Sequence, residues 1–229
     1  MPEARSVVVT GASRGLGLAS AAHLHARGWR VVAAMRSPDV GLERLRAATG
    51  ATADDSRLVG VRLDLDDPAS IAATAKQVEQ AVGAPHALVH NAGVAAFGGV
   101  EDMPADVFEQ VFTTNLFGPV RLTRALLPAM RAAGRGRVVV VSSQGGARGM
   151  PGISAYAASK GALERWAEAL AQEVAPFGLG VTVLVSGTFD TDILTEQTPD
   201  HGDYDGPYAP AYTAMRRMWS WHRSRWRIA

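Results

Sequence analysis

A tyrosine and a lysine four residues apart are the first feature of this sequence that could do chemistry. Tyr156 and Lys160 stand in a stretch with helical patterning, where residues i and i+4 share a face. An ammonium beside a phenol favours the phenolate, so we expect the pKa of Tyr156 to fall from about 10 toward neutrality. A tyrosine tuned in this way is a usable general acid or base. The simpler interpretation is a half-buried tyrosine beside an unrelated surface lysine.

The scarcity of lysine favours the chemical interpretation. Among 23 basic residues only Lys76 and Lys160 are lysines, and one of the two falls at this spacing. Lysine carries a compact charge on a flexible stem, whereas arginine is bulkier and forked, so arginine would replace it poorly. Shortly before Tyr156, an apolar run ends in Ser142 and Ser143, which adds hydroxyl groups to the same region.

A glycine-rich loop near the N-terminus is the second feature with chemical potential. An apolar run, Ser6–Thr10, leads into Gly11, Ala12, Ser13, Arg14, Gly15, Leu16 and Gly17, and a helical stretch follows. A helix that begins after such a turn directs backbone N–H groups at a pyrophosphate, and glycine lets the backbone approach it. The spacing differs from the Gly-x-Gly-x-x-Gly fingerprint, and a tight turn that needs glycine for geometry alone is the alternative. Its place between first strand and first helix favours binding.

These residues must be positioned by alternating strands and helices. Strands are expected at 6–10, 30–34, 58–63, 87–90, 137–142 and 181–185, and helices at 16–27, 42–48, 68–82, 104–132 and 153–176. Nearly continuous apolar strands are typical of a parallel sheet buried on both faces. The pattern predicts an α/β fold in one domain, 1–229, with a doubly wound parallel sheet of the Rossmann type and three αβα layers. Strand patterning stops after Val185.

Composition excludes several classes of function. The chain has 229 residues, 47% of them hydrophobic and 20% charged, with a formal net charge of +1. This near-neutral balance gives no reason to expect nucleic acid as a partner. There is no cysteine and no His-Glu-x-x-His spacing, so no metal site is expected. Without an apolar run of membrane-spanning length or a signal-peptide pattern, we expect a cytoplasmic protein with no stable membrane association.

Taken together, these motifs resemble the short-chain dehydrogenase/reductase family. The resemblance covers Ser6 to about Thr191 and comprises Thr10-Gly-x-x-x-Gly-x-Gly17, Asn91-Ala92-Gly93, Asn115, Ser143, Tyr156-x-x-x-Lys160 and Gly187-x-x-x-Thr191. It implies hydride transfer between a nicotinamide cofactor and a small-molecule carbonyl or alcohol. It also implies that Tyr156 moves the proton, that Ser143 hydrogen-bonds the same oxygen, and that Lys160 binds the nicotinamide ribose. Asn115 would hold a helix kink and a water.

The cofactor implied is NADP(H), with NAD(H) the weaker alternative. An acid at the end of the second strand would bind a ribose 2′-OH, whereas this strand ends in Met35-Arg36. Arg36 and Arg14 could pair with a 2′-phosphate. In the other interpretation, both arginines are ordinary surface residues and Asp39 binds the ribose 2′-OH of NAD(H).

Further cofactor contacts follow from the resemblance. Asp64 and Leu65 match the family's adenine contacts, and Phe189 and Thr191 its carboxamide contacts. Ser186-Gly187 stands where the family usually has Pro-Gly, and the loss of proline is expected to loosen that loop.

The end of the chain departs from the family. Residues from about 189 to 229 are expected to form a lid and an atypical Arg/Trp-rich segment, so the sheet should have six strands with the usual seventh missing or replaced. Asp192–Ala229 is expected to be the least stable part. The family pairs through its long helices, which implies a homodimer or homotetramer with Trp166 near the partner.

An NAD-dependent alcohol dehydrogenase and a non-catalytic NADP(H)-binding protein are the competing functions.

Overall fold

The chain folds around a parallel β-sheet. The structure, a computed structural model, describes residues 5–187 and 198–225, the last eight of them as backbone alone. In the described residues six parallel strands pair in the order β3-β2-β1-β4-β5-β6. They are β1 (Ser6–Thr10), β2 (Arg30–Met35), β3 (Leu58–Arg62), β4 (Ala87–His90), β5 (Gly136–Ser143) and β6 (Leu179–Ser186). The predicted doubly wound, six-stranded fold is confirmed.

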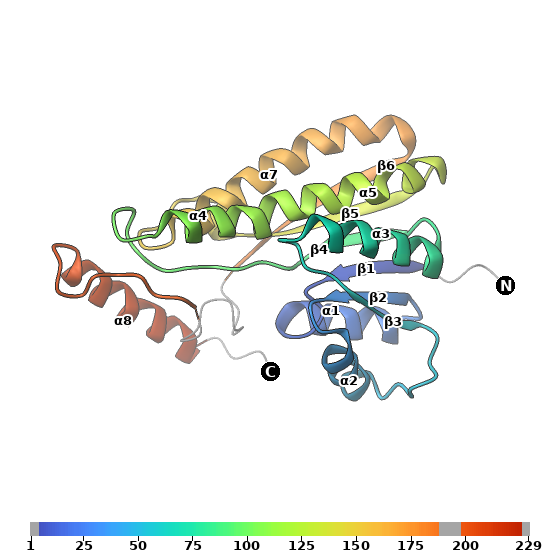
Figure 1. Cartoon of the computed structure of the whole chain (residues 1–229), viewed down its shortest axis with the longest axis horizontal. Helices are drawn as coiled ribbons and strands as arrows, with labels where there is room; N and C mark the ends of the chain where they lie inside the picture. Colours follow the sequence, from blue (N-terminus) through green and yellow to red (C-terminus); the bar gives the residue numbers. More distant parts are fainter. Residues whose placement is uncertain (1–4, 188–197, 226–229) are drawn as a thin grey trace.

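Helices cover both faces of the sheet, which explains why the strands are apolar throughout (Figure 1). On one face lie α1 (Gly15–Ala26) and α2 (Pro38–Thr49), and on the other α3 (Pro68–Val82), α5 (Gly118–Ala132) and α7 (Ser154–Val174). Successive residues of β1 serve the two layers: Val8 packs with α3 and α5, while Val7 and Val9 pack with α1 and α2. Because the six strands are parallel, their carboxyl ends meet at one edge of the sheet.

The helical stretch expected over 104–132 is interrupted, and Asn115 explains where. The chain forms α4 (Ala105–Phe112), a π-helical turn η1 (Thr113–Phe117) and then α5. The side chain of Asn115 is fully buried, accepts from Val94 N at 2.8 Å and donates to Val94 O at 2.9 Å. A π turn inserts an extra residue into the helix and is frequent at functional sites. The helix kink that the family resemblance implied at Asn115 is therefore present, as a π turn within the helical stretch expected over 104–132.

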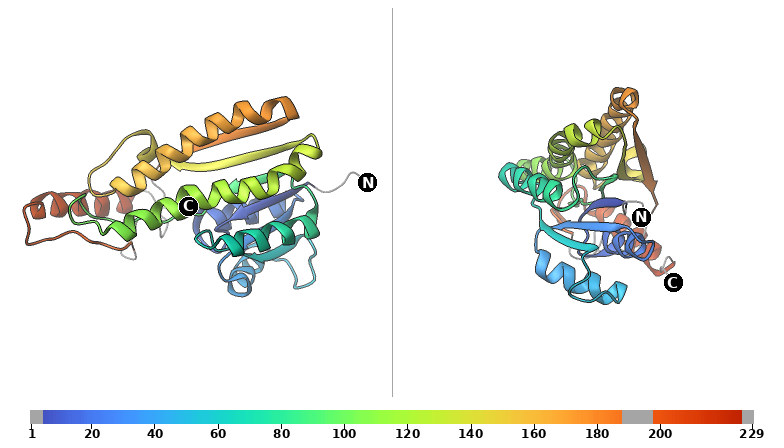
Figure 2. Two further views of the ribbon diagram at one scale, coloured as in Figure 1. Left: turned by 45° about the horizontal axis from the view of Figure 1, so that its top comes forward. Right: turned by 90° about the vertical axis from the view of Figure 1, so that its right-hand side faces the viewer.

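The sheet ends at an open edge. No seventh strand pairs with β6 in the described part of the chain, and Leu184 and Val185 on β6 are about half exposed, at 50% and 51%. The C-terminal helix α8 (Ala209–Arg225) lies beyond the carboxyl ends of the strands (Figures 1 and 2). No helix among the described residues is long and apolar enough to cross a membrane.

One tyrosine anchors the start of α8 to the loop after β4. Tyr212 is 2% exposed, its hydroxyl accepts from Gly99 N at 2.8 Å, and it donates to the carboxylate of Asp102. Backbone pairing of Phe97 with residues 199–201 extends this contact. The contact is local, so it fixes the first turn of α8 against the body of the protein.

We expect amide hydrogen exchange across Asp192–Ala229 to be faster than in the sheet when the protein is alone and to slow when NADPH is added. Residues 192–197 and 226–229 lie outside the described residues, and hydrogen bonds from residues 199–212 join the described part to the loop after β4. Segments with few buried contacts open most readily. Protection equal to that of β1 throughout the segment in the ligand-free protein would contradict this expectation.

Candidate active site

Three side chains expected to do chemistry meet at the carboxyl edge of the sheet. β5 ends at Ser143, and α7 begins a few residues later and carries Tyr156 and Lys160 on one face. Gly145 lies between the ring of Tyr156 and the hydroxyl group of Ser143, because a Cβ there would be 3.4 Å from Tyr156 Cε1 and 3.6 Å from Ser143 Oγ. The Nζ atom of Lys160 is 5.8 Å from the centroid of the Tyr156 ring. The structure thus brings all three residues into one site.

Lys160 is buried and held by the sheet. Its side chain is 3% exposed, and Nζ donates to Val141 O at 2.8 Å. Burial disfavours the ammonium and lowers the pKa of Lys160 to about 8, while the carboxylate of Glu164 acts in the opposite direction. The amine is therefore mostly charged at neutral pH.

The direction expected for the pKa of Tyr156 was wrong. Burial raises the pKa of this phenol above its usual value, and a hydrogen bond with Ser143 only partly offsets the rise. The ring packs in an apolar cluster with Phe97, Ile153 and Tyr212, which excludes the water that would stabilise a phenolate. Tyr156 is therefore a protonated phenol at neutral pH, suited to giving a proton.

Asn115 connects the π turn to the helix of Tyr156. Its Nδ2 donates to Ser159 Oγ at 3.0 Å, and Ser159 Oγ donates to Tyr156 O at 2.8 Å. The same amide holds Val94, which follows the Asn91-Ala92-Gly93 turn after β4. Asn115 thus fixes three parts of the site relative to one another.

The glycine loop and the turn after β4 are locked together. Thr10 Oγ1 accepts from the backbone N of Asn91 and of Ala92, each at 3.1 Å, and Asn91 Nδ2 donates to Thr10 O at 3.0 Å. Gly11, at φ +68°, packs against Ala92, where a Cβ would lie 2.9 Å from Ala92 Cα. This contact requires glycine.

The loop fits a dinucleotide phosphate on its own geometry. α1 begins at Gly15 with no side-chain cap on its first turn and no acid in it, so its N–H groups face outward from a positive helix end. Gly15 is exposed at φ +54°, and Ser13 is half-buried beside it. Leu16 is likewise half-buried, and Gly17 is buried. These residues leave the backbone uncovered where an anion would bind.

The remaining residues expected at the cofactor occupy the same edge or fall outside the description. Arg14 and Arg36 are exposed, and so is Asp39, the alternative partner of a 2′-OH. Asp64 follows β3, where its backbone N–H donates to Ser70 Oγ at 2.9 Å, and Leu65 is buried. Gly93 is half-buried and Gly187 exposed, while Phe189 and Thr191 lie outside the described residues.

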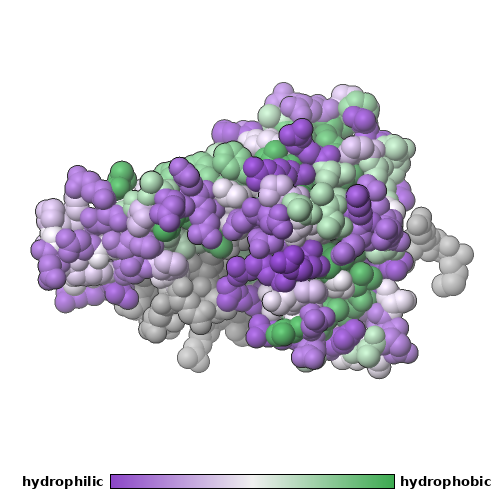
Figure 3. Space-filling view, viewed as in Figure 1, coloured by the Kyte–Doolittle hydropathy of each residue, from purple (hydrophilic) through white to green (hydrophobic). Residues whose placement is uncertain are grey.

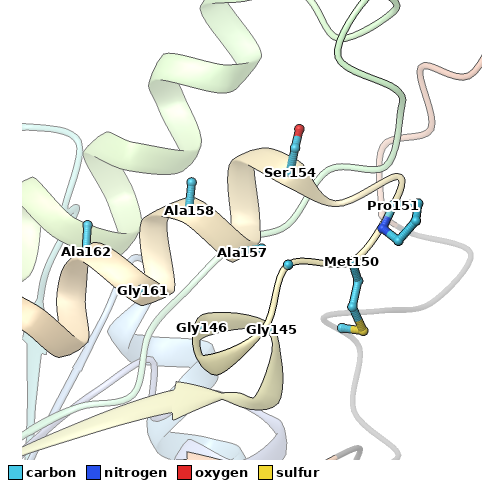
Figure 4. Close-up of a pocket in the computed structure, with 10 residues that line it drawn as sticks. Gly145, Gly146, Met150, Pro151, Ser154, Ala157, Ala158, Gly161 and Ala162 are labelled. Carbon is cyan, nitrogen blue, oxygen red and sulfur yellow. The ribbon is translucent and has the colours of Figure 1, made fainter.

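A cavity of about 520 Å³ lies next to the site without including it. It is bounded by the loop after β5 and by the outer face of α7, where Ala158 and Ala162 point outward (Figure 4). Ser143, Tyr156 and Lys160 do not line it. This hollow is therefore a surface feature of α7 and does not mark where a substrate would react. In the described residues, no three His, Asp or Glu side chains gather as a metal site.

Sequence reasoning missed two contributors to the site. Tyr212 packs beside Tyr156 although it lies far along the chain, and no local pattern pointed to it. Glu164 is buried behind Lys160, and a signal was available: it follows Lys160 by four residues and so shares its face of α7.

This fold and this site define a known class of protein. The sequence model of the short chain dehydrogenase family matches residues 5–202. The chain belongs to the short-chain dehydrogenase/reductase family.

Individual relatives agree with this assignment. Dehydrogenase/reductase SDR family member 7B from Bos taurus is 40% identical over 86% of this chain, which spans 62% of the length of that relative. A short-chain dehydrogenase from Streptomyces avermitilis has a similar structure, with a TM-score of 0.82 and 38% identity over 94% of this chain and 77% of its own. A metagenomic short-chain oxidoreductase in complex with NADP has a TM-score of 0.74 and 34% identity over 80% of this chain and 82% of its own.

Proposed function

We propose that this protein is an NADP(H)-dependent oxidoreductase that acts on a small-molecule carbonyl compound or secondary alcohol. The observation that carries the proposal is the meeting of Ser143, Tyr156 and Lys160 at the carboxyl edge of the sheet, next to a glycine loop with an uncapped helix start. When bound, the cofactor supplies or accepts the hydride.

The residues of the site divide the remaining work. Tyr156 gives its phenolic proton to the carbonyl oxygen as that oxygen gains charge, and takes a proton from the alcohol in the reverse direction. Ser143 donates a hydrogen bond to the same oxygen and stabilises the developing charge. Lys160 places an ammonium beside the phenolate that remains and toward the ribose hydroxyls. Asn115 holds α7 and the turn after β4 in a fixed position relative to each other.

The protonation state of Tyr156 favours reduction. Burial raises the pKa of this tyrosine, so at neutral pH it holds the proton that a carbonyl reduction consumes. Oxidation would need the phenolate, which the apolar packing of Phe97 and Tyr212 disfavours. Carbonyl reduction is therefore the direction we propose to assay first, and alcohol oxidation runs through the same proton transfer in reverse.

Preference for NADP(H) over NAD(H) rests on charge at the end of β2. Arg36 follows β2 directly, is exposed, and has no acid beside it at Met35, and Arg14 stands at the start of α1. A guanidinium can pair with the 2′-phosphate that NADP has and NAD lacks. The NADP-bound relative of similar fold supports the same choice.

We expect Arg36→Ala to weaken NADPH binding at least roughly tenfold, the order of a charged hydrogen bond of about 1.5–3 kcal/mol. NADH binding should stay nearly unchanged because it offers no 2′-phosphate. Titration of both cofactors against the variant measures the difference. Arg44→Ala is the matched control, since Arg44 is an exposed arginine on the outer part of α2. Equal losses for the two cofactors would rule out this role for Arg36.

We also propose a homodimer or homotetramer formed through α5 and α7. Hydrophobic side chains gather in the upper part of the face in Figure 3, where Figure 1 places these helices. On α7, Ala158 is exposed and Trp166 half-buried, although the indole also packs against His90 of its own core with ring centroids 6.2 Å apart. Light scattering at micromolar concentration should give at least twice the monomer mass. A monomer mass would contradict this assembly.

A further inference from the structure

A buried carboxylate lies one helical turn beyond Lys160. Glu164 is 6% exposed, and a glutamate that is almost fully buried requires partners. Ser142 Oγ supplies one, donating to Glu164 Oε1 at 2.5 Å. Ser142 itself is 2% exposed and is the residue directly before Ser143. The carboxylate is therefore tied to the strand end that carries the catalytic serine.

Gly146 packs against the Glu164 carboxylate, the Ser142 hydroxyl and the backbone of Lys160. A Cβ on Gly146 would lie 2.5 Å from Glu164 Oε1, 2.8 Å from Ser142 Oγ and 3.0 Å from the carbonyl carbon of Lys160. Only glycine at position 146 leaves room for these three groups to lie this close to its Cα. Positions i and i+4 place the side chains of Lys160 and Glu164 on one face of α7.

Few other charges act at this place. His90 is fully buried on β4, and both its burial and the charge of Lys160 lower its pKa to about 3, so this imidazole is neutral. Tyr156 is a neutral phenol, and the guanidinium of Arg165 lies 3.7 Å from Glu164 Oε2 on a largely exposed side chain. Glu164 is the charged group that counteracts the burial of the Lys160 amine.

A second serine, Ser186 on β6, forms a hydrogen bond to the strand end that carries Ser142. Ser186 Oγ donates to Ser142 O at 2.6 Å, across the register pairs Ser142–Val185 and Ser143–Ser186. Ser186 stands where the family usually has proline, whose missing N–H and rigid ring offer no such hydrogen bond. The loop expected to be looser without proline lies, beyond Gly187, outside the described residues.

We propose that Glu164 is a positioning residue which, buried one helical turn from Lys160 and held by Ser142, supplies the negative charge that keeps the Lys160 amine an ammonium where it bonds Val141 O. It would act through Lys160 and would not touch the substrate. This inference rests on the proposed role of Lys160 in the reaction. Its physical content, a carboxylate that keeps a buried amine protonated, is measurable without turnover.

The chain contains only two lysines, which makes a direct titration possible. In protein labelled at lysine Cε, NMR should give two signals, and Lys76→Arg identifies the exposed one. The signal that remains in Lys76→Arg should report the pKa of Lys160 and titrate near 8. We expect Glu164→Gln to move the midpoint of Lys160 at least about one pH unit lower, because the neighbouring charge is gone.

The matched control is Glu168→Gln, one turn further along α7. Its side chain is 52% exposed and pairs with Arg165 at 2.7 Å, so the Lys160 midpoint should not move. If Glu164→Gln does not fold, Glu164→Met replaces it, since an apolar chain of similar length needs no hydrogen bonds in a buried place. A Lys160 midpoint unchanged in the folded variant would overturn the proposal. A shifted midpoint in a protein without turnover would uphold it and count against the proposed function instead.

Discussion

Replacing Tyr156 by phenylalanine is expected to lower turnover by roughly 100- to 10,000-fold, the range that a positioned acid or base contributes. The change removes one hydroxyl, and the ring keeps its packing with Phe97, Ile153 and Tyr212. Because only the transferable proton is lost, NADPH should bind with nearly the affinity of the unsubstituted protein. Steady-state rates and a cofactor titration measure the two quantities.

Measuring turnover and NADPH affinity in the same variant distinguishes a loss of catalysis from a loss of folding. A phenylalanine variant that lost NADPH binding together with turnover would indicate a damaged site, and its thermal midpoint would show this. Retained turnover across the accepted substrates would instead show that another group moves the proton.

Replacing Gly17 by alanine is expected to have the second largest effect, on cofactor binding. A Cβ at this position would lie 2.2 Å from Gly11 O and 2.4 Å from Asn91 Nδ2, so the loop or the turn after β4 must shift. Overpacking of this kind costs about 1–3 kcal/mol. Because both displaced groups frame the proposed phosphate site, we expect the affinity for NADPH to fall at least roughly tenfold.

Gly149→Ala is the matched control for that variant. Gly149 lies in an exposed part of the loop after β5, and a Cβ there would meet no atom within 4 Å. Its NADPH affinity and thermal midpoint should match those of the unsubstituted protein. If Gly17→Ala bound NADPH as tightly as this control, the glycine loop would not be the cofactor site.

Much of the fold could be predicted because local patterns decide it. β1, β4 and α3 have the predicted bounds, since continuous apolar strands and a proline at the start of α3 are local signals. The candidate site residues could be named because Tyr156 and Lys160 share a helix face by their spacing, and because the family resemblance added Ser143 at the end of a strand.

Other features depend on contacts between distant residues. The family resemblance implied a helix kink at Asn115, but the bonds from Asn115 to Val94 and Ser159 could not be predicted, because neither partner lies near it in sequence. The pKa of Tyr156 moves in the opposite direction to the one expected because Tyr212 and Phe97 bury the ring. A pattern can place a charge beside a phenol, but it cannot report how much water the phenol has lost.

The most direct test of the proposed function is the consumption of NADPH by the purified protein with a panel of aldehydes and ketones, followed by absorbance. We expect at least one carbonyl compound to be reduced, with the rate abolished in Tyr156→Phe and with NADH used less efficiently than NADPH. A protein that binds NADPH in the same titration but turns over no member of the panel, nor any matching alcohol with NADP, would contradict an oxidoreductase and indicate a binding protein.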